Sequence, residues 1–307
     1  MLLIVRMKSW LSVSISSGIK TNPLMEIIEQ NLVAKNPKMK SEDGIVATND
    51  FIAVIDGSTS KSQHRHSLFR SNGRYAMQLV SRYIRRMPKN TTCEAFLRGV
   101  TAYIRKHYKK SMLPRLAEHP EDRLTCSVVV FSRLCREIWM IGDCHCLVTS
   151  PTSHLSPLTS PLLPLYYDNP KPYEAELAAL RAEEACRQLA DGKTTDDLCR
   201  NDTARPVIIP RMIETMRNQN VTYSVVDGFP IPRQHVLVIP LDFSPHEIVL
   251  ASDGYPFLYP SLDESEAALQ HQRQHDPLNI GPNFQATKAF HPDNNSFDDR
   301  TYVRFLI

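Results

Sequence analysis

The sequence lacks any apolar run of the roughly 20 residues that a membrane-spanning helix needs. It also lacks a strong charge imbalance, because its formal net charge is only +3. Surfaces that bind nucleic acid usually carry a marked excess of Lys and Arg. We therefore expect neither a membrane nor a nucleic acid as partner. Two local basic clusters, at 81–89 and 103–110, are interpreted as solvated helix faces, with an anionic partner as the alternative.

The sequence also lacks a disulfide framework. Its seven cysteines are odd in number and irregularly spaced, which favours a reducing compartment and a cytoplasmic protein. Cys144, His145 and Cys146 look like a metal-binding triplet. On a strand, however, the two cysteines share one face and the histidine points to the other. We interpret them as part of a buried core strand.

A clear signal peptide is missing at the start of the chain as well. The first 18 residues are apolar, but Arg6 and Lys8 interrupt them and no small-residue cleavage site follows. The pattern predicts an opening strand. Met7 is an alternative start of translation.

The sequence does contain paired apolar runs joined by short polar links. The runs Ile45–Ala47 and Phe51–Ile55 flank a turn-favouring Asn-Asp pair and predict a hairpin. Apolar residues at helical spacing predict helices over 67–87 and 91–108, the second capped by Thr92. A second hairpin is expected from the runs 124–131 and 137–148.

The second half of the chain begins with a segment rich in Pro and Ser at 150–172, which predicts a surface loop. A strong helix at 173–190 follows, closed by Gly192, and then a polar mixed stretch at about 193–220. The remaining elements are expected as strands at 222–228, 235–241, 247–254 and 298–307, and a helix at 263–274. Adjacent strands with short links favour antiparallel pairing. We therefore predict an α+β fold with two mostly antiparallel sheets faced by helices, in one domain spanning 1–307.

Four acidic residues stand at or beside the ends of predicted strands. Asp56 and Asp253 are each followed by Gly, Asp298 is followed by a second Asp, and Asp143 follows Gly142. Carboxylates that converge from several strands repel one another unless cations or shared protons lie between them. Oxygen ligands of this kind suit Mg²⁺ or Mn²⁺. The alternative is a metal-free scaffold in which each Asp-Gly pair is an ordinary turn.

The ordered series of motifs resembles the metal-dependent Ser/Thr protein phosphatases of type 2C, in particular bacterial members. The series consists of Glu42-Asp43, Asp56-Gly57, the strand at 124–131, Gly142-Asp143, "LASDG" at 250–254 and "DDRT" at 298–301, and it spans about residues 41–305. The resemblance implies a four-layer α-β-β-α sandwich of two antiparallel sheets flanked by helices. It also implies that the Pro-rich and helical segment at about 150–220 is an inserted flap beside the site.

The resemblance further implies a binuclear centre of Mn²⁺ or Mg²⁺, with a third, weaker ion at Asp143. The metal ligands that it implies are Glu42, Asp43, Asp56, Gly57 through its carbonyl, Asp143, Asp253 and Asp298. Asp56 and Asp253 are also predicted to be catalytic through the water that the metals activate. Lys38 stands at the family's phosphate-contacting position and is the third predicted catalytic residue.

Three positions depart from the family's pattern. Lys38 replaces an Arg and so contacts phosphate as a point charge, with Lys40 as a nearby alternative. Ser58 stands where many eukaryotic members carry a His as proton donor, and His64 and His66 are other candidates for that role. Phe257 replaces an Asp that serves the third metal.

The sequence thus predicts a metal-dependent phosphomonoester hydrolase that acts on phosphoserine or phosphothreonine in proteins through a metal-activated water. The alternative is a catalytically weak or inactive phosphatase-like domain that binds a partner or a phosphorylated ligand. The substitutions at Lys38, Ser58 and Phe257 motivate this alternative. The sequence predicts no oligomeric state.

Overall fold

The computed structural model describes residues 25–61, 64–149 and 164–307. Its described strands form two five-stranded sheets, and each neighbouring pair is antiparallel. One sheet has the order β1 (Glu26–Val33), β10 (Arg300–Leu306), β9 (Glu247–Ala251), β6 (His145–Thr149) and β7 (Leu165–Tyr167). The other has the order β2 (Gly44–Ala47), β3 (Phe51–Gly57), β4 (Cys126–Ser132), β5 (Glu137–Ile141) and β8 (Leu237–Pro240).

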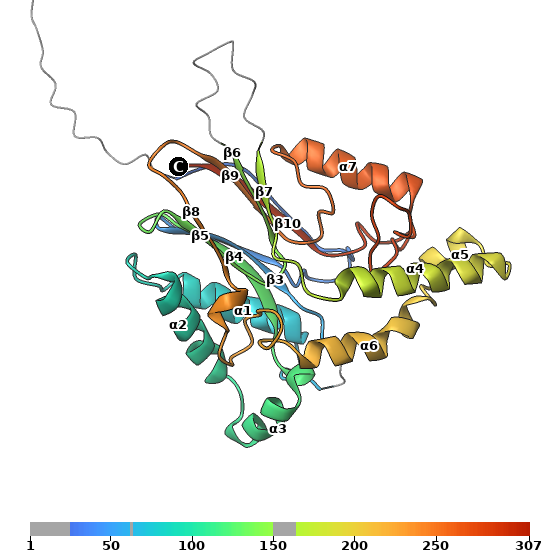
Figure 1. Ribbon diagram of the computed structural model, residues 1–307, viewed down its shortest axis with the longest axis horizontal. Coiled ribbons are helices and arrows are strands. Elements are labelled where there is room, and N and C mark those ends of the chain that lie inside the picture. Colours follow the sequence, from blue (N-terminus) through green and yellow to red (C-terminus); the bar gives the residue numbers. More distant parts are fainter. Residues whose placement is uncertain (1–24, 62–63, 150–163) are drawn as a thin grey trace, which may run out of the picture.

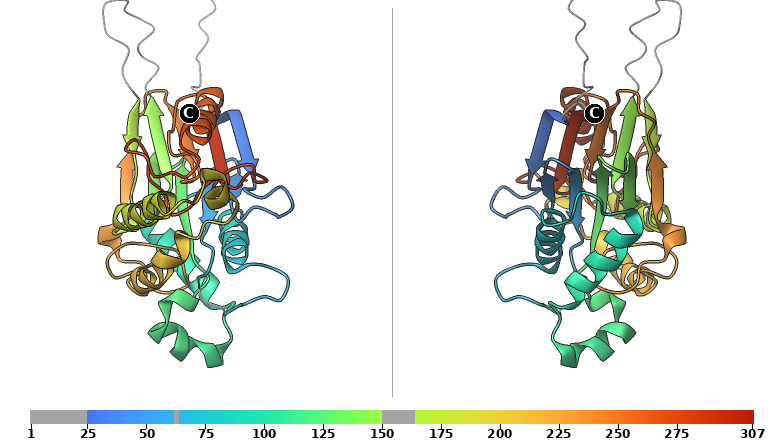
Figure 2. Two further views of the ribbon diagram at one scale, coloured as in Figure 1. Left: turned by 90° about the vertical axis from the view of Figure 1, so that its right-hand side faces the viewer. Right: turned by 90° about the vertical axis from the view of Figure 1, so that its left-hand side faces the viewer.

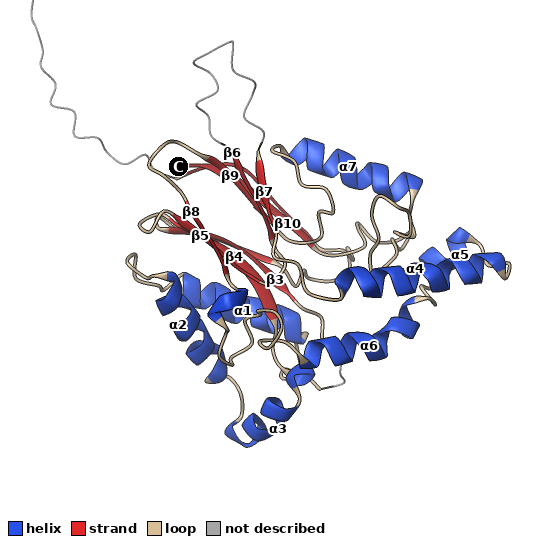
Figure 3. Cartoon of the chain, in the orientation of Figure 1, coloured by secondary structure: helices blue, strands red, loops and turns tan. Residues whose placement is uncertain are grey.

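Helices cover the outer faces of both sheets, as Figures 1 and 2 show. They are α1 (Asn72–Ile84), α2 (Cys93–Arg105), α3 (Leu113–Glu118), α4 (Glu174–Ala190), α5 (Thr195–Arg200), α6 (Arg205–Arg217) and α7 (Leu262–His275). Helices α1 and α2 pack on the β2–β8 sheet and α7 lies on the other sheet, while α4–α6 extend from one end of the sandwich (Figure 3). The layer order is helix, sheet, sheet, helix, so the predicted α+β fold and four-layer sandwich are confirmed.

The alternation of side chains along β3 explains why the sheets are sandwiched in this way. Phe51, Ala53 and Ile55 point toward α1 and α2, whereas Ile52 and Val54 point toward the other sheet. Because both faces of the strand are covered, all five positions are apolar and buried. The same arrangement places the carboxyl end of β3 at one end of the sandwich.

The predicted hairpins and helices are largely confirmed. The first hairpin is β2–β3, and the two predicted helices are α1 and α2. The hydroxyl of Thr92 accepts a hydrogen bond from the backbone N–H of Ala95 at 3.3 Å, as the predicted cap requires. Gly192, after α4, has a φ of +97°, which a glycine adopts at little cost.

The predicted strand at 137–148 is wrong in one respect, because it is two strands in different sheets. The chain leaves β5, turns at Gly142 with a φ of +84°, and enters β6 in the second sheet. Cys144 and Cys146 are buried between the sheets, which confirms the core interpretation of the triplet. This crossing places Asp143 between the two sheets.

The structure corrects two further predictions and assigns one stretch that the sequence had left unassigned. The segment 150–172 was predicted as a loop, and the structure describes it only from residue 164. It contains the short strand β7, which lies at the edge of its sheet, where neighbouring prolines are tolerated. The polar stretch 193–220 holds α5 and α6. The run 222–228 forms only an isolated bridge, between Val226 and Cys126 of β4, and not a continuous strand. The side chains of Asn220 and Asp227 instead accept hydrogen bonds from the backbone N–H groups of Val225 and Phe229.

The first predicted strand, within residues 1–18, lies outside the described residues, whereas β1 was not predicted. No helix among the described residues has the length and apolar character needed to cross a membrane.

Candidate metal centre

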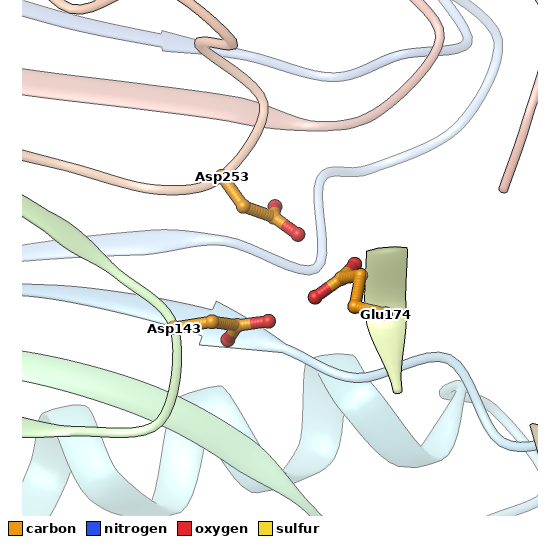
Figure 4. A group of neighbouring side chains, drawn as sticks. All are labelled: Asp143, Glu174 and Asp253. Carbon is orange, nitrogen blue, oxygen red and sulfur yellow. The ribbon is translucent and has the colours of Figure 1, made fainter. Parts of the chain in front are cut away.

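Three carboxylates meet at the end of the sandwich where β3, β5 and β9 terminate. Asp143 lies in the crossing from β5 to β6, Asp253 follows β9, and Glu174 is the first residue of α4 (Figure 4). Each offers one oxygen, and these oxygens all lie within 4.8 Å of one another. The antiparallel pairings explain the convergence, since β6 and β10 begin where β9 ends.

Asp56, at the end of β3, belongs to the same charge cluster. Loss of water around its carboxyl raises the pKa of Asp56 well above its usual value, and the charges of Asp253, Asp43 and Asp143 raise it further. Desolvation also raises the pKa of Asp253 to about 7, with added repulsion from Asp143 and Glu174. This mutual repulsion calls for positive charge among the carboxylates.

One positive charge comes from the chain itself. The ammonium of Lys171 lies 2.5 Å from Oδ2 of Asp143, and the hydroxyl of Ser127 donates to Oδ1 of Asp143 at 2.5 Å. Burial alone would raise the pKa of Asp143, but the charge and hydrogen bond of Lys171 and the bond from Ser127 lower it. Lys171 therefore offsets one carboxylate of the cluster.

Glu42 and Asp43 are buried next to this cluster, and not in a solvated loop. Thr301 donates to Oδ2 of Asp43 at 2.9 Å, and Thr59 donates to Oε2 of Glu42. The other oxygens, Oδ1 of Asp43 and Oε1 of Glu42, are buried without a hydrogen-bond partner among the described residues. Buried oxygens without donors fit a bound cation.

Asp298 and Asp299 have different surroundings. Oδ1 of Asp298 pairs with the ammonium of Lys35 at 3.0 Å, and Oδ2 pairs with Lys288. Asp299 accepts hydrogen bonds from the backbone N–H groups of Lys35 at 2.7 Å and Glu42 at 2.6 Å. Asp299 thus fixes the segment 35–42 that brings Glu42 to the site, and both oxygens of Asp298 already face lysines.

Gly57 is held in place by a close approach of two backbones. A Cβ at Gly57 would overlap the carbonyl oxygens of Gly73 and Glu42. Only glycine therefore lets the start of α1 pack onto the end of β3.

A cavity of about 280 Å³ opens beside the carboxylates. Its lining includes five of the residues that the sequence analysis singled out, namely Asp56, Gly57, Asp143, Asp253 and Asp298. Ser58, one of the departures from the family's pattern, lines it too. The cavity is thus the place where the strand-end carboxylates meet.

The remaining candidates from the sequence lie elsewhere. Lys38 and Lys40 are exposed and do not line the cavity. His66 makes a hydrogen bond between its Nε2 and the carbonyl of Asp122 at 2.7 Å and packs against His64, and neither histidine lines the cavity. Phe257 packs edge-on against another phenylalanine.

Sequence reasoning missed several residues of the site. The charged ones that line the cavity are Lys61, Asp168, Lys171, Glu174, Arg205 and Lys288. Glu174 was part of a predicted helix, where an acidic residue in the first turn is explained by the helix dipole. The other five lie in segments without a motif, so no local signal pointed to them.

The donor set fits a divalent cation of the Mg²⁺ or Mn²⁺ type. All the candidate ligands are carboxylate oxygens or the carbonyl of Gly57, which such hard cations prefer. These carboxylates outnumber the three lysines that pair with them, Lys35, Lys171 and Lys288, and two buried oxygens lack hydrogen-bond donors.

No protein-family model matches the sequence, and neither does any curated protein. Several solved structures are similar in fold. PppA, described as a key regulatory component of the type VI secretion system in Pseudomonas aeruginosa, is 10% identical, with 92% of this chain and 97% of that chain covered and a TM-score of 0.47.

Two further structures are Ser/Thr phosphatases. The catalytic domain of PstP, in complex with two manganese ions, is 13% identical, with 92% of this chain and 99% of that chain covered and a TM-score of 0.44. Stp1 from Staphylococcus aureus is 12% identical, with coverage of 95% and 98% and a TM-score of 0.45. At these values the similarity assigns no activity to this chain.

Proposed function

We propose that this protein is a metal-dependent phosphomonoester hydrolase that uses two Mn²⁺ or Mg²⁺ ions. The observation that carries the proposal is the convergence of Asp143, Glu174 and Asp253 within 4.8 Å, next to Asp56. Four acidic side chains from separate elements gather at one cavity, and such a gathering is unfavourable without cations.

The chain's own residues would divide the work as follows. Asp56 and Asp253 would hold the two ions together with the carbonyl of Gly57, and Asp43 would contribute through its unpaired Oδ1. When bound, the ions supply charge neutralisation at the phosphoryl group and a water of lowered pKa. Glu42 and Asp299 would keep the ligand loop in place through the bond from the Glu42 N–H to Asp299.

We further propose a phosphorylated serine or threonine in a protein as substrate, and the cytoplasm as location. All seven cysteines are free thiols, as a reducing compartment permits. The helices α4 and α6 supply Glu174, Leu177 and Met212 to the cavity lining, so the segment that contains them would act as the substrate-shaping flap of a single domain. Ser58 lines the cavity without being an effective acid, so we assign leaving-group protonation to water.

The test is hydrolysis of p-nitrophenyl phosphate in Mn²⁺ and in EDTA. We expect activity in Mn²⁺ only, and a loss of at least about 100-fold in Asp56→Asn and in Asp253→Asn, since even indirect partners of a metal cost about that much. Asp263→Asn is the matched control, because Asp263 is exposed in the first turn of α7. Full activity in both site variants would refute the proposal.

A second function has support from the lysines of the site. Lys171 pairs with Asp143, and Lys35 and Lys288 pair with Asp298. A lysine ammonium that pairs with a carboxylate competes with a metal ion for that carboxylate. The alternative function is therefore a domain that binds a phosphorylated ligand without hydrolysing it. Calorimetric Mn²⁺ titration alongside the assay separates the two: Mn²⁺ binding or ligand binding without hydrolysis favours the alternative.

A further inference from the structure

The cavity carries a group of basic side chains that the proposed chemistry does not use. Lys61 comes from the loop after β3, Arg205 is the first residue of α6, and Lys288 lies in the loop before β10, and all three line the cavity. They come from three segments far apart in the sequence. Their gathering is therefore a property of the fold and not of one charged stretch.

The positions of these cations are fixed by backbone contacts. Nη1 of Arg205 donates to the carbonyl of Thr287 at 2.7 Å, which places its guanidinium beside Lys288. Nζ of Lys61 donates to the carbonyl of Thr59 at 2.9 Å. These bonds satisfy one donor on each side chain and leave the other donors available to a ligand.

The charges of the group are poorly compensated. Within the part of the chain that the structure describes, no carboxylate forms an ion pair with Lys61 or Arg205. Lys288 shares Asp298 with Lys35, so two lysines face one carboxylate. Burial, followed by the charges of Arg205 and Lys35, lowers the pKa of Lys61 to about 7, as expected where cations repel one another.

We propose that Lys61, Arg205 and Lys288 form a subsite for a second anionic group of the substrate, next to the phosphoryl group that is hydrolysed. This inference rests on the proposed function and names its substrate class: a phosphopeptide whose neighbouring residue is acidic or also phosphorylated. An anion on the three side chains would relieve their repulsion and form charge-assisted hydrogen bonds. The apolar part of the lining, which includes Leu177 and Met212, would contact the remainder of the peptide.

The first test measures binding of inorganic phosphate to the metal-free protein in EDTA by calorimetry. We expect binding that weakens with added salt. It should weaken about tenfold in Lys61→Met and in Arg205→Met, since each removes a hydrogen bond to a charged group. Arg205→Lys, which keeps the charge, should retain most of the binding. Arg200→Met is the control, because Arg200 is exposed on α5 and pairs with Asp196 of the same helix.

Equal binding by the wild type and both Met variants, or no binding by the wild type, would overturn the subsite. Thermal unfolding of each variant shows whether it is folded, and removal of a repelling cation should not lower its stability. The second test compares Mn²⁺-dependent hydrolysis of a phosphoserine peptide with a neighbouring Glu against the same peptide with a neighbouring Ala. The wild type should prefer the Glu peptide, and Lys61→Met should lose that preference.

The two tests separate the two ideas. If the metal chemistry is wrong, no peptide is hydrolysed, but phosphate binding in EDTA still depends on Lys61 and Arg205. If the subsite is wrong, both peptides are hydrolysed equally and the Met variants bind phosphate as the wild type does.

Discussion

At Asp143, a lysine ammonium stands where the family resemblance implies a third, weaker metal ion. Lys171 lies 2.5 Å from Asp143, and the charges of Asp143, Glu174 and Asp56 raise the pKa of Lys171 well above its usual value although burial opposes this. Lys171 therefore stays protonated at neutral pH and acts as a fixed cation in the cluster.

Replacement of this cation should change the metal stoichiometry. In Lys171→Met, Asp143, Glu174 and Asp253 lose their internal counter-ion, and we expect about one more Mn²⁺ per chain than in the wild type. Calorimetry and metal analysis after gel filtration measure this number. Lys106→Met, on an exposed position, is the control. An unchanged number of bound ions in a folded Lys171→Met protein would show that Lys171 does not occupy a metal position.

The sequence indicated some of these residues and not others for a physical reason. Asp56, Asp143 and Asp253 were predictable because each ends or follows an apolar run, and strand ends meet at a sheet edge. Glu174 and Lys171 reach the site through a long connection whose path depends on tertiary packing, so no local pattern reveals them. Lys38 was selected by its alignment with a family motif, and its position on an exposed turn leaves that role a prediction.

Among the elements, α4 is tied to the cavity wall by one buried arginine. Arg181 is fully buried, pairs with Asp202 at 2.8 Å, and donates to the carbonyls of Leu278 at 2.8 Å and Ala286 at 3.2 Å. It thereby joins α4 to the loop that carries Lys288. The interaction is buried and has several partners, so its loss removes the counter-ion of Asp202 and a donor from each of two carbonyls.

We expect Arg181→Met to destabilise the protein by about 3–5 kcal/mol, measured by urea unfolding at neutral pH. Arg187→Met is the matched control on the same helix. Arg187 is exposed and pairs with Glu184 and Asp191, so its loss should cost less than about 1 kcal/mol. Similar values for the two variants would show that Arg181 does not hold α4 in place.

The predictions of individual helices and strands were confirmed where the hydrophobic periodicity and the turn or cap residues indicated the same element, as in β2–β3 and α1. They were wrong where tertiary contacts determine the path of the chain. The run 137–148 is continuous in the sequence, yet Gly142 divides it between two sheets. The run 222–228 has the composition of a strand, but it forms only an isolated bridge, at Val226, to Cys126 of β4. The next residue, Asp227, is held by Arg123 at 2.9 Å and by Gln219 at 3.1 Å.

For the whole molecule, the buried carboxylates make stability depend on pH and on metal. Burial raises the pKa of Asp43 to about 6 and that of Asp253 to about 7. A carboxyl with a raised pKa in the folded state favours folding below its unfolded pKa, near 4, and loses that contribution as pH rises through its folded pKa. The metal-free protein should therefore lose stability between about pH 4.5 and 7.

The expected loss is on the order of a few kcal/mol, at 1.36 kcal/mol for each unit of pKa difference. Urea unfolding in EDTA at several pH values measures it. Mn²⁺ at 100 times its dissociation constant should restore about 2.7 kcal/mol at pH 7. Asp253→Asn should lose less stability than the wild type as pH rises, and it should gain less stability from Mn²⁺. A metal-free protein whose stability rises steadily from pH 4.5 to 7 would contradict the account.

The overall architecture was the most predictable level, because most strands have an apolar pattern of their own and short links favour antiparallel neighbours. Strand β1 was not predicted because its residues are mostly exposed, and it is held mainly by its pairing with β10. Such a strand depends on a partner more than 260 residues away, which no local window contains.

We propose that the converging carboxylates hold divalent cations that act on a phosphomonoester. The most direct test measures phosphate release by the wild type and by Asp253→Asn, each in Mn²⁺ and in EDTA. We predict release by the wild type in Mn²⁺, none in EDTA, and a loss of at least about 100-fold in the variant. Release that is equal in all four conditions, or absent from the folded, Mn²⁺-loaded wild type, would contradict the claim.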